Sequence, residues 1–315
     1  MTLNIVARST KATPNVHALG AKLYRFPLPS QSGQPATSVD QSVVFTTAFT
    51  FAAPLGSSAP VDPDKLMVSF AQAANSFAKA GTRNEYGNVG PLSWGDEVKH
   101  LSRYRDAPYG DKKQCEVFVA GELAGGSRGA KAVKNVCMFV LDVDSGGTIA
   151  ESETALRLMG LEGVISPTIS YGKTTTFVNA DDYGKWAQKC GLATTHTTEN
   201  VKRYLVDKGK LLPSIAADCT VATELEHTNE GVAIRVGHAA LQKHRIVVPL
   251  TKRIEVLSFV KGATTHQGVI AAWATAYKRV AAALGVTFDA ACADLARMYY
   301  WPSAYDDAQA DKLRA

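Results

Sequence analysis

Two aspartates one residue apart, Asp142 and Asp144, carry the clearest chemical potential of this sequence. They end an apolar, β-prone run that begins at Val136, and because side chains alternate faces along a strand, both carboxylates should point the same way. Neighbouring carboxylates repel each other unless a cation lies between them, and Mg²⁺ or Mn²⁺ prefers such oxygen ligands. The run therefore predicts a divalent metal site. The alternative is a strand end with solvated acids, because short Asp-x-Asp matches are common.

A glycine-rich segment at 121–129 precedes this run and contains GGSRG, in which the arginine is Arg128; Lys131 and Lys134 follow. Such a backbone with interleaved cations can hold a phosphate chain. The spacing matches no P-loop, so a flexible surface loop is an equal alternative.

Two more basic side chains lie far along the chain. Residues 231–238 and 244–250 are apolar and β-branched, and the short connection between them predicts a hairpin-like pair of strands. This arrangement would place His238 and Arg245 near the turn, where both could face the same edge as the acid pair. A lone histidine near a turn is more often structural than functional.

The elements that must position these residues follow from periodicity and turn signals. Strands are expected at 43–51 and at 163–170, and Pro167 favours an edge or a bulge in the second. Acids near Asp62 open a predicted helix whose apolar stripe is Leu66, Phe70, Ala74 and Phe77. Further helices are expected at 94–104, 151–159, 181–189, 199–208 and 264–284.

Composition bounds the class of protein. The chain has 315 residues, 46% of them hydrophobic, which suits a globular protein with a sizeable core. The net charge of +5 permits a polyanionic partner without requiring one. Five cysteines without CxxC spacing argue against a zinc site or a disulfide framework. No apolar run is long enough for a membrane span and no signal core is present at the N-terminus, so we expect a cytoplasmic protein, or one of the host cytoplasm if it is viral, with no membrane partner.

Three segments in a fixed order carry a resemblance to a known family. A strand ending LDVD, the segment VGHAALQKHRIVVPLTKRIE and the terminal FDAACADLARMYYWPS resemble the archaeo-eukaryotic primase superfamily, most closely the primase-polymerase domains of phage and plasmid replication proteins. The resemblance covers about residues 116–303 and is weak across the middle. It implies an α/β (α+β) fold with an RRM-like, mostly antiparallel catalytic sheet and helices.

The expected organisation combines the resemblance with the order of elements along the chain, since the resemblance does not extend to the first hundred residues. An N-terminal α/β module with an irregular arm would occupy 1–114, and the catalytic core 115–305. A helical insertion would lie at 178–228, and 306–315 would form a charged tail.

The resemblance also implies roles for single residues. Asp142 and Asp144 would bind the metal, and Asp289 would be the third acid, with Asp294 as the alternative. His238 resembles the histidine of the second motif, with Arg245 as a nearby cation. The remaining expected nucleotide contacts are Ser170, Lys173 and Arg297, and those expected to contact the nucleic acid are Lys112, Lys113, Arg128, Lys131 and Lys134.

One departure from the family pattern keeps an alternative open. Phage members often carry Thr-x-Ser-His-Gly-Lys after the second strand, whereas Tyr171 stands here at the histidine position. The second motif could therefore lie either around Ser170 or at His238.

The implied function is template-dependent nucleotidyl transfer, as a primase, a DNA polymerase or both, in phage or plasmid DNA replication. Mg²⁺ or Mn²⁺ would be the cofactor, and a single-stranded DNA template and NTP or dNTP the partners, with a replicative helicase as a further candidate. One alternative is a catalytically weakened replication initiator or single-stranded DNA-binding protein on the same scaffold, which the Tyr171 departure favours. A more remote one is a DxD phosphatase, in which the first aspartate is a nucleophile. Ser145 follows the acid pair here, which departs from the Asp-Gly-Thr continuation of that class.

Overall fold

The computed structural model describes residues 22–24, 65–74, 86–103, 105–106, 112–229, 231–258 and 265–304. Most of the expected N-terminal arm, a strand predicted at 43–51 and the charged tail at 306–315 lie outside these ranges. Within them the chain is a mixed α/β protein whose sheets are antiparallel apart from one short parallel pair, which confirms the predicted α+β class.

The sheet that carries the acid pair has the order β1-β7-β11-β6, and each neighbouring pair is antiparallel. Its strands are Lys22–Tyr24 (β1), Gly163–Pro167 (β7), His244–Glu255 (β11) and Asn135–Val143 (β6). Helix α2 (Ile149–Leu158) connects β6 to β7, and β11 lies between these two strands, as in a split β-α-β unit. The prediction of β7 as an edge strand is wrong, because β1 and β11 pair on both of its sides and Pro167 only ends it.

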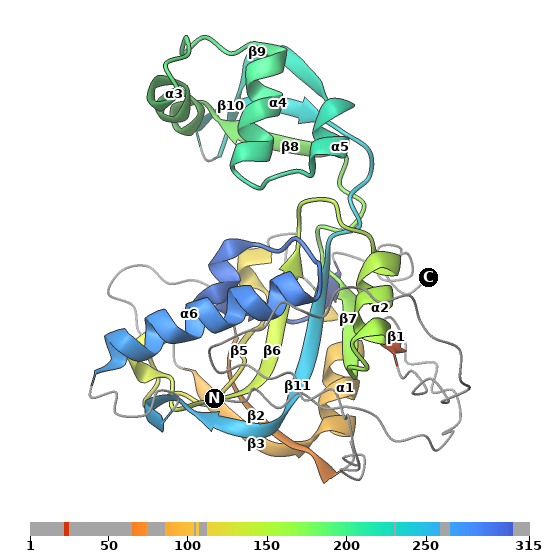
Figure 1. The fold of residues 1–315 in the computed structure, drawn as a ribbon, viewed down its shortest axis with the longest axis vertical. Helices are drawn as coiled ribbons and strands as arrows, with labels where there is room; N and C mark the ends of the chain where they lie inside the picture. Colours follow the sequence, from red (N-terminus) through yellow and green to blue (C-terminus); the bar gives the residue numbers. More distant parts are fainter. Residues whose placement is uncertain are drawn as a thin grey trace, which may run out of the picture.

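Strand β6 is buried along its whole length because layers cover both faces of the sheet. On one face, helices α6 (His266–Ala283) and α2 lie in front of the strands (Figure 1). The Phe139 ring packs on the Tyr277 ring of α6 at a centroid distance of 4.4 Å, and the Tyr277 hydroxyl donates to the Val140 carbonyl. This packing explains why the run contains almost no polar residue before its terminal aspartate.

A second sheet, of order β12-β5-β2-β3, and helix α1 (Trp94–Ser102) lie on the opposite side. Its strands are Met298–Tyr300 (β12), Val117–Val119 (β5), Met67–Ala73 (β2) and Gly87–Ser93 (β3). Trp301 packs on Phe118 and Phe70, with ring centroids 4.4 and 5.1 Å apart. Strands β2 and β3 of the expected N-terminal module therefore share a sheet with β5 and β12 of the expected catalytic region, and their buried side chains belong to the same core.

The helix predicted from the Leu66 to Phe77 stripe is wrong where the chain is described. Residues 67–73 form β2, which pairs with β3 on one side and β5 on the other. Val68 and Phe70 are fully buried in this central position. Strand pairing on both sides outweighed a helical spacing that only four apolar residues supported.

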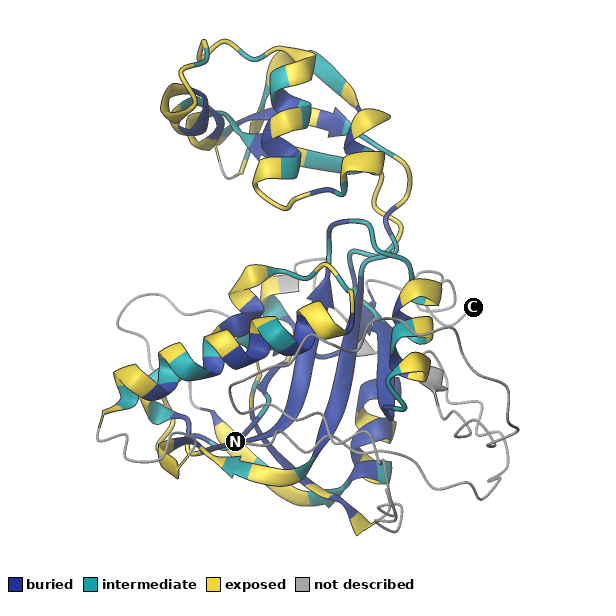
Figure 2. Cartoon of the chain, viewed as in Figure 1, coloured by how far each residue is buried: buried dark blue, intermediate teal, exposed yellow. Residues whose placement is uncertain are grey.

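Residues from about 174 to 238 form a separate lobe with its own hydrophobic core, visible as a second buried interior in Figure 2. Its sheet has the order β8-β10-β9. Its elements are Thr175–Asn179 (β8), Ala180–Lys189 (α3), Thr198–Asp207 (α4), Pro213–Ala217 (α5), Thr220–Thr228 (β9) and Gly231–Gly237 (β10). The helices predicted at 181–189 and 199–208 are confirmed. The predicted hairpin of β10 with β11 is wrong, since β10 pairs inside the lobe and β11 in the acid-bearing sheet.

Other predicted helices are confirmed as α1, α2 and α6. Two-residue strands, Arg105–Asp106 (β4) and Ser303–Ala304 (β13), form a small parallel pair beside the second sheet. Among the described helices, none has both the length and the apolar character needed to cross a bilayer.

Gly121, in the segment between β5 and β6, lies where the backbones of the two sheets approach each other closely. A Cβ at Gly121 would lie 1.8 Å from the backbone carbonyl oxygen of Asn135, whereas one at Gly129 would meet nothing within 4 Å. We expect Gly121→Ala to lower the free energy of unfolding by about 2 kcal/mol or more, because backbone must move to make room. Gly129→Ala in the same loop should stay within about 0.5 kcal/mol of the parent. Urea denaturation measures both, and equal stabilities would contradict the close approach.

Candidate functional site

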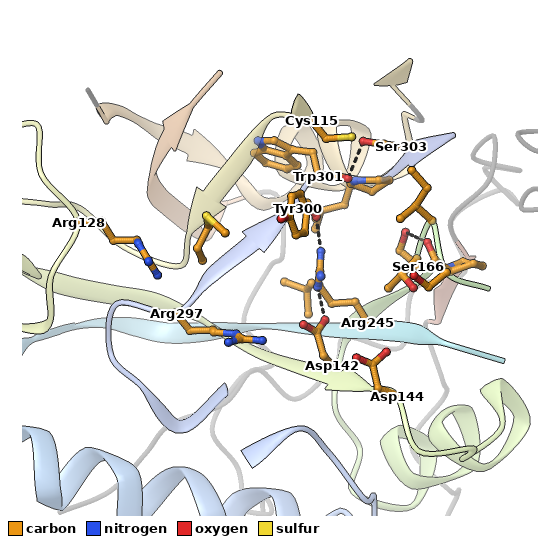
Figure 3. A pocket seen from close by; sticks show the side chains of 18 residues that line it. Cys115, Arg128, Asp142, Asp144, Ser166, Arg245, Arg297, Tyr300, Trp301 and Ser303 are labelled. Atoms are coloured by element: carbon orange, nitrogen blue, oxygen red, sulfur yellow. Dashed lines mark hydrogen bonds and ion pairs between the residues drawn. The ribbon is translucent and has the colours of Figure 1, made fainter. Parts of the chain in front are cut away.

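A pocket of about 330 Å³ lies between the two sheets, beside the C-terminal end of β6. Asp142 and Asp144 form its floor in Figure 3, with Arg128 and Arg297 on one side and Ser166 on the other. Tyr300 and Trp301 close the side opposite the acids. The pocket thus combines carboxylates, guanidinium groups and aromatic rings that come from distant parts of the chain.

Asp142 is engaged by Arg245, its register partner on β11. The Arg245 Nε donates to Asp142 Oδ1 at 2.6 Å, and each residue is only 7% exposed. The same guanidinium donates to the Tyr300 carbonyl through Nη1 and lies 5.1 Å from the Tyr299 ring centroid. Burial disfavours the charged guanidinium, but the Asp142 carboxylate outweighs this effect and raises the pKa of Arg245.

Asp144 lies one residue beyond the end of β6 and is half-buried. Both aspartates point into the pocket, as alternation along the strand predicts (Figure 3). Within the described chain, its carboxylate makes no hydrogen bond or ion pair. Burial raises the pKa of Asp144, the Asp142 and Asp289 charges add to this rise, and Lys243 and Arg245 oppose it. This is therefore an acid whose negative charge is incompletely balanced.

The late segment reaches the acid pair through its backbone. The Asp289 N–H donates to the Asp142 carbonyl at 3.0 Å, which brings the predicted third acid beside β6. Its carboxylate accepts from the Ala291 N–H at 3.0 Å and from Arg297 Nη2 at 2.8 Å, and it does not line the pocket. Asp294, the alternative third acid, is exposed and accepts from the Ala296 N–H.

Arg297 lines the pocket, as a predicted nucleotide contact should. Its Nε is buried and has no acceptor among the described residues, although Nη2 is paired with Asp289. Arg128 lies beside it, and its Nη1 donates to the Ala296 carbonyl at 3.2 Å. Two guanidinium groups therefore form one wall of the pocket.

The two candidates for the second motif lie in different places. Ser170 lines the pocket, whereas Lys173 is exposed and lies outside the lining. His238 is held at the base of the lobe, where its ring nitrogens lie 2.9 Å from Thr176 Oγ1 and 2.8 Å from the Ala239 carbonyl. No described histidine lines the pocket, so the segment around Ser170 fits the geometry better than His238.

The cations predicted to follow a template are only partly gathered. Arg128 lines the pocket, while Lys131 and Lys134 are exposed on the same loop before β6. Lys113 is exposed before β5, and Lys112 is described only as part of the same short 3₁₀ turn.

Several pocket residues were given no role by the sequence analysis, although all but Ser166 lie within segments that carry the resemblance. Ser166 and Thr168 line it from the end of β7, and Tyr300, Trp301 and Ser303 from the end of β12. What these residues share is their position in the fold, because they lie at or just after the C-terminal ends of β7 and β12. That shared position requires the pairing of β12 with β5, which the sequence does not reveal.

The donor set suits a hard divalent cation. Mg²⁺ is commonly held by one or two carboxylates, with substrate phosphates and water in the other positions. Asp144 offers an incompletely balanced carboxylate, and Asp142 Oδ2 makes no hydrogen bond among the described residues. No group of three or more His, Cys, Asp or Glu side chains that could hold a metal occurs in the described part of the chain. The structure thus provides a two-carboxylate site and keeps Asp289 in an ion pair.

Comparison with known proteins gives no family assignment. No family model, curated protein or solved structure matches the chain. We therefore base the function on the pocket and on the order of the motifs in the sequence.

Arg245 and Arg297 provide a matched pair for measuring how burial changes the contribution of an arginine–aspartate ion pair to stability. Arg245→Met leaves Asp142 charged and buried without a partner, which should lower the free energy of unfolding by about 3–5 kcal/mol. Arg297→Met breaks an ion pair whose side chains are 31% and 34% exposed, and should cost about 1 kcal/mol or less. Chemical denaturation at constant pH compares the two, and similar losses would mean that the Arg245 pair has no special role.

The raised pKa of Asp144 predicts a pH dependence of stability with a defined sign. The folded state holds the Asp144 proton more tightly than the unfolded state, whose pKa is near 3.8. Stability is therefore lost as pH rises from that value through the folded pKa. Asp144→Asn should raise the melting temperature relative to wild type at about pH 7 and change it little at about pH 3.

Asp96 provides a control of opposite sign, because hydrogen bonds from Lys99 and Ser93 lower its pKa. Asp96→Asn should make no gain at neutral pH. A pH-independent effect of Asp144→Asn would show that its folded pKa is not raised.

Proposed function

We propose that this chain is a template-dependent nucleotidyltransferase of the primase-polymerase type. The observation that carries the proposal is the shared pocket: the Asp142 and Asp144 pair faces two arginines that come from a glycine-rich loop and from the late FDAACADLAR segment. Acids on the floor of the pocket and cations on an adjoining wall fit a nucleoside triphosphate bound with a divalent ion.

A bound divalent ion would supply activation of the attacking hydroxyl and neutralisation of charge at the reacting phosphate. Asp144 and Asp142 Oδ2 are the groups that would hold it. Arg245 fixes the Asp142 carboxylate through Oδ1 and leaves Oδ2 for a ligand. Two-metal sites require further ligands, for which Asp289 would have to exchange its ion pair with Arg297.

The arginine wall suits the phosphates of the nucleotide. Arg128 and Arg297 lie on one side of the acids, and guanidinium groups bind phosphate oxygens through paired donors. When Arg297 binds phosphate in place of Asp289, the Asp289 carboxylate becomes available. The apolar wall of Ile169, Met298 and Tyr300 offers a surface for the base.

The geometry argues against the phosphatase alternative. That chemistry needs the first aspartate as an accessible nucleophile. Asp142 is 7% exposed and one of its oxygens is fixed by Arg245. A metal ligand needs only one available oxygen, and the contact with Arg245 leaves Asp142 Oδ2 for that purpose.

A second candidate is a replication initiator or single-stranded DNA-binding protein that has lost catalysis. The observation that favours it is the placement of His238 at the base of the lobe, outside the pocket lining. The enzyme and the binding protein differ in a primer-synthesis assay on single-stranded DNA, with Mg²⁺ and with Mn²⁺.

In that assay, Asp144→Asn should lower the rate by about 100-fold or more, because several kcal/mol of charge stabilisation at the phosphate would be lost. Asp144 is a cleaner target than Asp142, whose removal would leave Arg245 buried without its carboxylate. Arg128→Ala should raise the KM for nucleotide by about 10-fold, since it removes a charge-assisted contact.

Lys131→Ala is the control for Arg128→Ala, because Lys131 lies on the same loop but does not line the pocket. It should leave the KM unchanged. Primer synthesis that persists in Asp144→Asn would rule out the enzyme assignment. A wild-type chain that makes no primer with Mg²⁺ and none with Mn²⁺ would rule it out as well.

A further inference from the structure

The lobe touches the loop that follows the acid pair. The Leu212 N–H, at the start of α5, donates to the Ser145 carbonyl at 2.7 Å. Ser145 directly follows Asp144 and is only 3% exposed. The lobe therefore holds the backbone of the acid loop, although the rest of its core is separate.

The side chain of Ile215 completes this contact. Gly146 has a φ of +115°, and a Cβ there would lie 2.1 Å from Ile215 Cδ1 and 3.7 Å from Leu241 Cδ2. Glycine is thus required twice at this position, by the backbone conformation and by the isoleucine packed over it. The lobe and the loop fit each other closely enough for a shift of α5 to move Gly146.

The connection between lobe and body is itself a paired ribbon. The Thr168 N–H donates to the Lys243 carbonyl at 2.9 Å, and Gly172 and Leu241 continue the pairing. Thr168 and Ser170 on this ribbon also line the pocket. Figure 1 shows α5 at the end of the lobe next to this connection.

Asp144 depends on its backbone for its position. Its carboxylate has no hydrogen-bond partner among the described residues, so no side chain fixes it. On one side Val143 is held in β6 by pairing with His244. On the other side Ser145 is held by Leu212, and Gly146 by Ile215.

We propose that Ile215 and Leu212 are positioning residues: the lobe holds the 145–146 loop so that Asp144 meets a divalent cation beside Asp142. This inference rests on the proposed metal-binding role of the two aspartates. It gives the lobe a part in metal binding without any lobe side chain touching the metal.

The test is a Mn²⁺ titration of the full chain, followed by the electron paramagnetic resonance signal of free Mn²⁺ and without nucleotide or DNA. Ile215→Ala should weaken Mn²⁺ binding by about 10-fold, the effect expected when the support of a metal ligand is removed. Ile215→Met, which restores the reach of the side chain, should recover most of the affinity. Leu225→Ala is the matched control, because Leu225 belongs to the same lobe, is 48% exposed and lies on β9.

A melting curve for each variant separates positioning from loss of the fold. We expect Ile215→Ala to keep a single transition close to that of Leu225→Ala while differing from it in Mn²⁺ affinity. Should Ile215→Ala fail to fold, Ile215→Val removes only the Cδ1 that packs over Gly146 and should weaken Mn²⁺ binding as well. Unchanged Mn²⁺ affinity in the folded contact variants, with wild type binding Mn²⁺, would overturn the role of the lobe. A wild-type chain that takes up no Mn²⁺ would overturn the metal assignment and this inference together.

Discussion

The buried ion pair between Arg245 and Asp142 is the interaction on which the arrangement of the pocket depends. It joins β11 to β6 through side chains, and through the Tyr300 carbonyl it reaches β12 of the second sheet. The Tyr299 ring lies over the Arg245 guanidinium, and the Tyr299 hydroxyl donates to the Val140 carbonyl. Tyr299 therefore forms a second link between β12 and β6 beside the ion pair. Apolar residues can often replace a buried ion pair without loss of stability. What a charged pair provides here is an acid held in one orientation at the wall of a pocket.

The charges around this junction are nearly balanced in the absence of a ligand. Arg245 pairs with Asp142 and Arg297 with Asp289, while Asp144 has no ion-pair partner among the described residues. A dication and a polyanion could enter together at little electrostatic cost, since the cation would balance the acids and the anion the arginines. The cation can enter alone, because the Asp144 charge is incompletely balanced, whereas a polyanion alone would bring its negative charge close to that acid at low dielectric. A metal bound first is therefore expected to favour the entry of the polyphosphate.

Local sequence signals predicted an element well where the periodic pattern lies within the residues of that element. The acid-bearing strand, the lobe helices α3 and α4, and α6 were all predicted from local sequence signals. The failures concern pairing between distant segments. Residues 67–73 became a strand because β3 and β5 bind both of its edges, and β10 separated from β11 because a lobe is inserted there.

The site shows the same division between local and distant information. The two aspartates could be chosen from the strand alone, and Arg297 from its place in a late motif. The engagement of Arg245 could not be foreseen, because it depends on the register that sets Arg245 opposite Asp142. The exclusion of His238 from the pocket lining has a similar cause, since the lobe's own strand pairing holds it beside Thr176.

The attachment of the lobe has a consequence for how such a chain can diversify. Thr175 and Gly237 are register partners, and the His238 N–H donates to the Thr174 carbonyl at 2.8 Å, so the lobe leaves and re-enters the body at adjacent points. A graft at such a site leaves the flanking strands in register whatever its length, and longer inserts add little loop-closure entropy. Substituting one lobe for another could therefore retune the floor of the pocket while the surrounding sheets stay as they are.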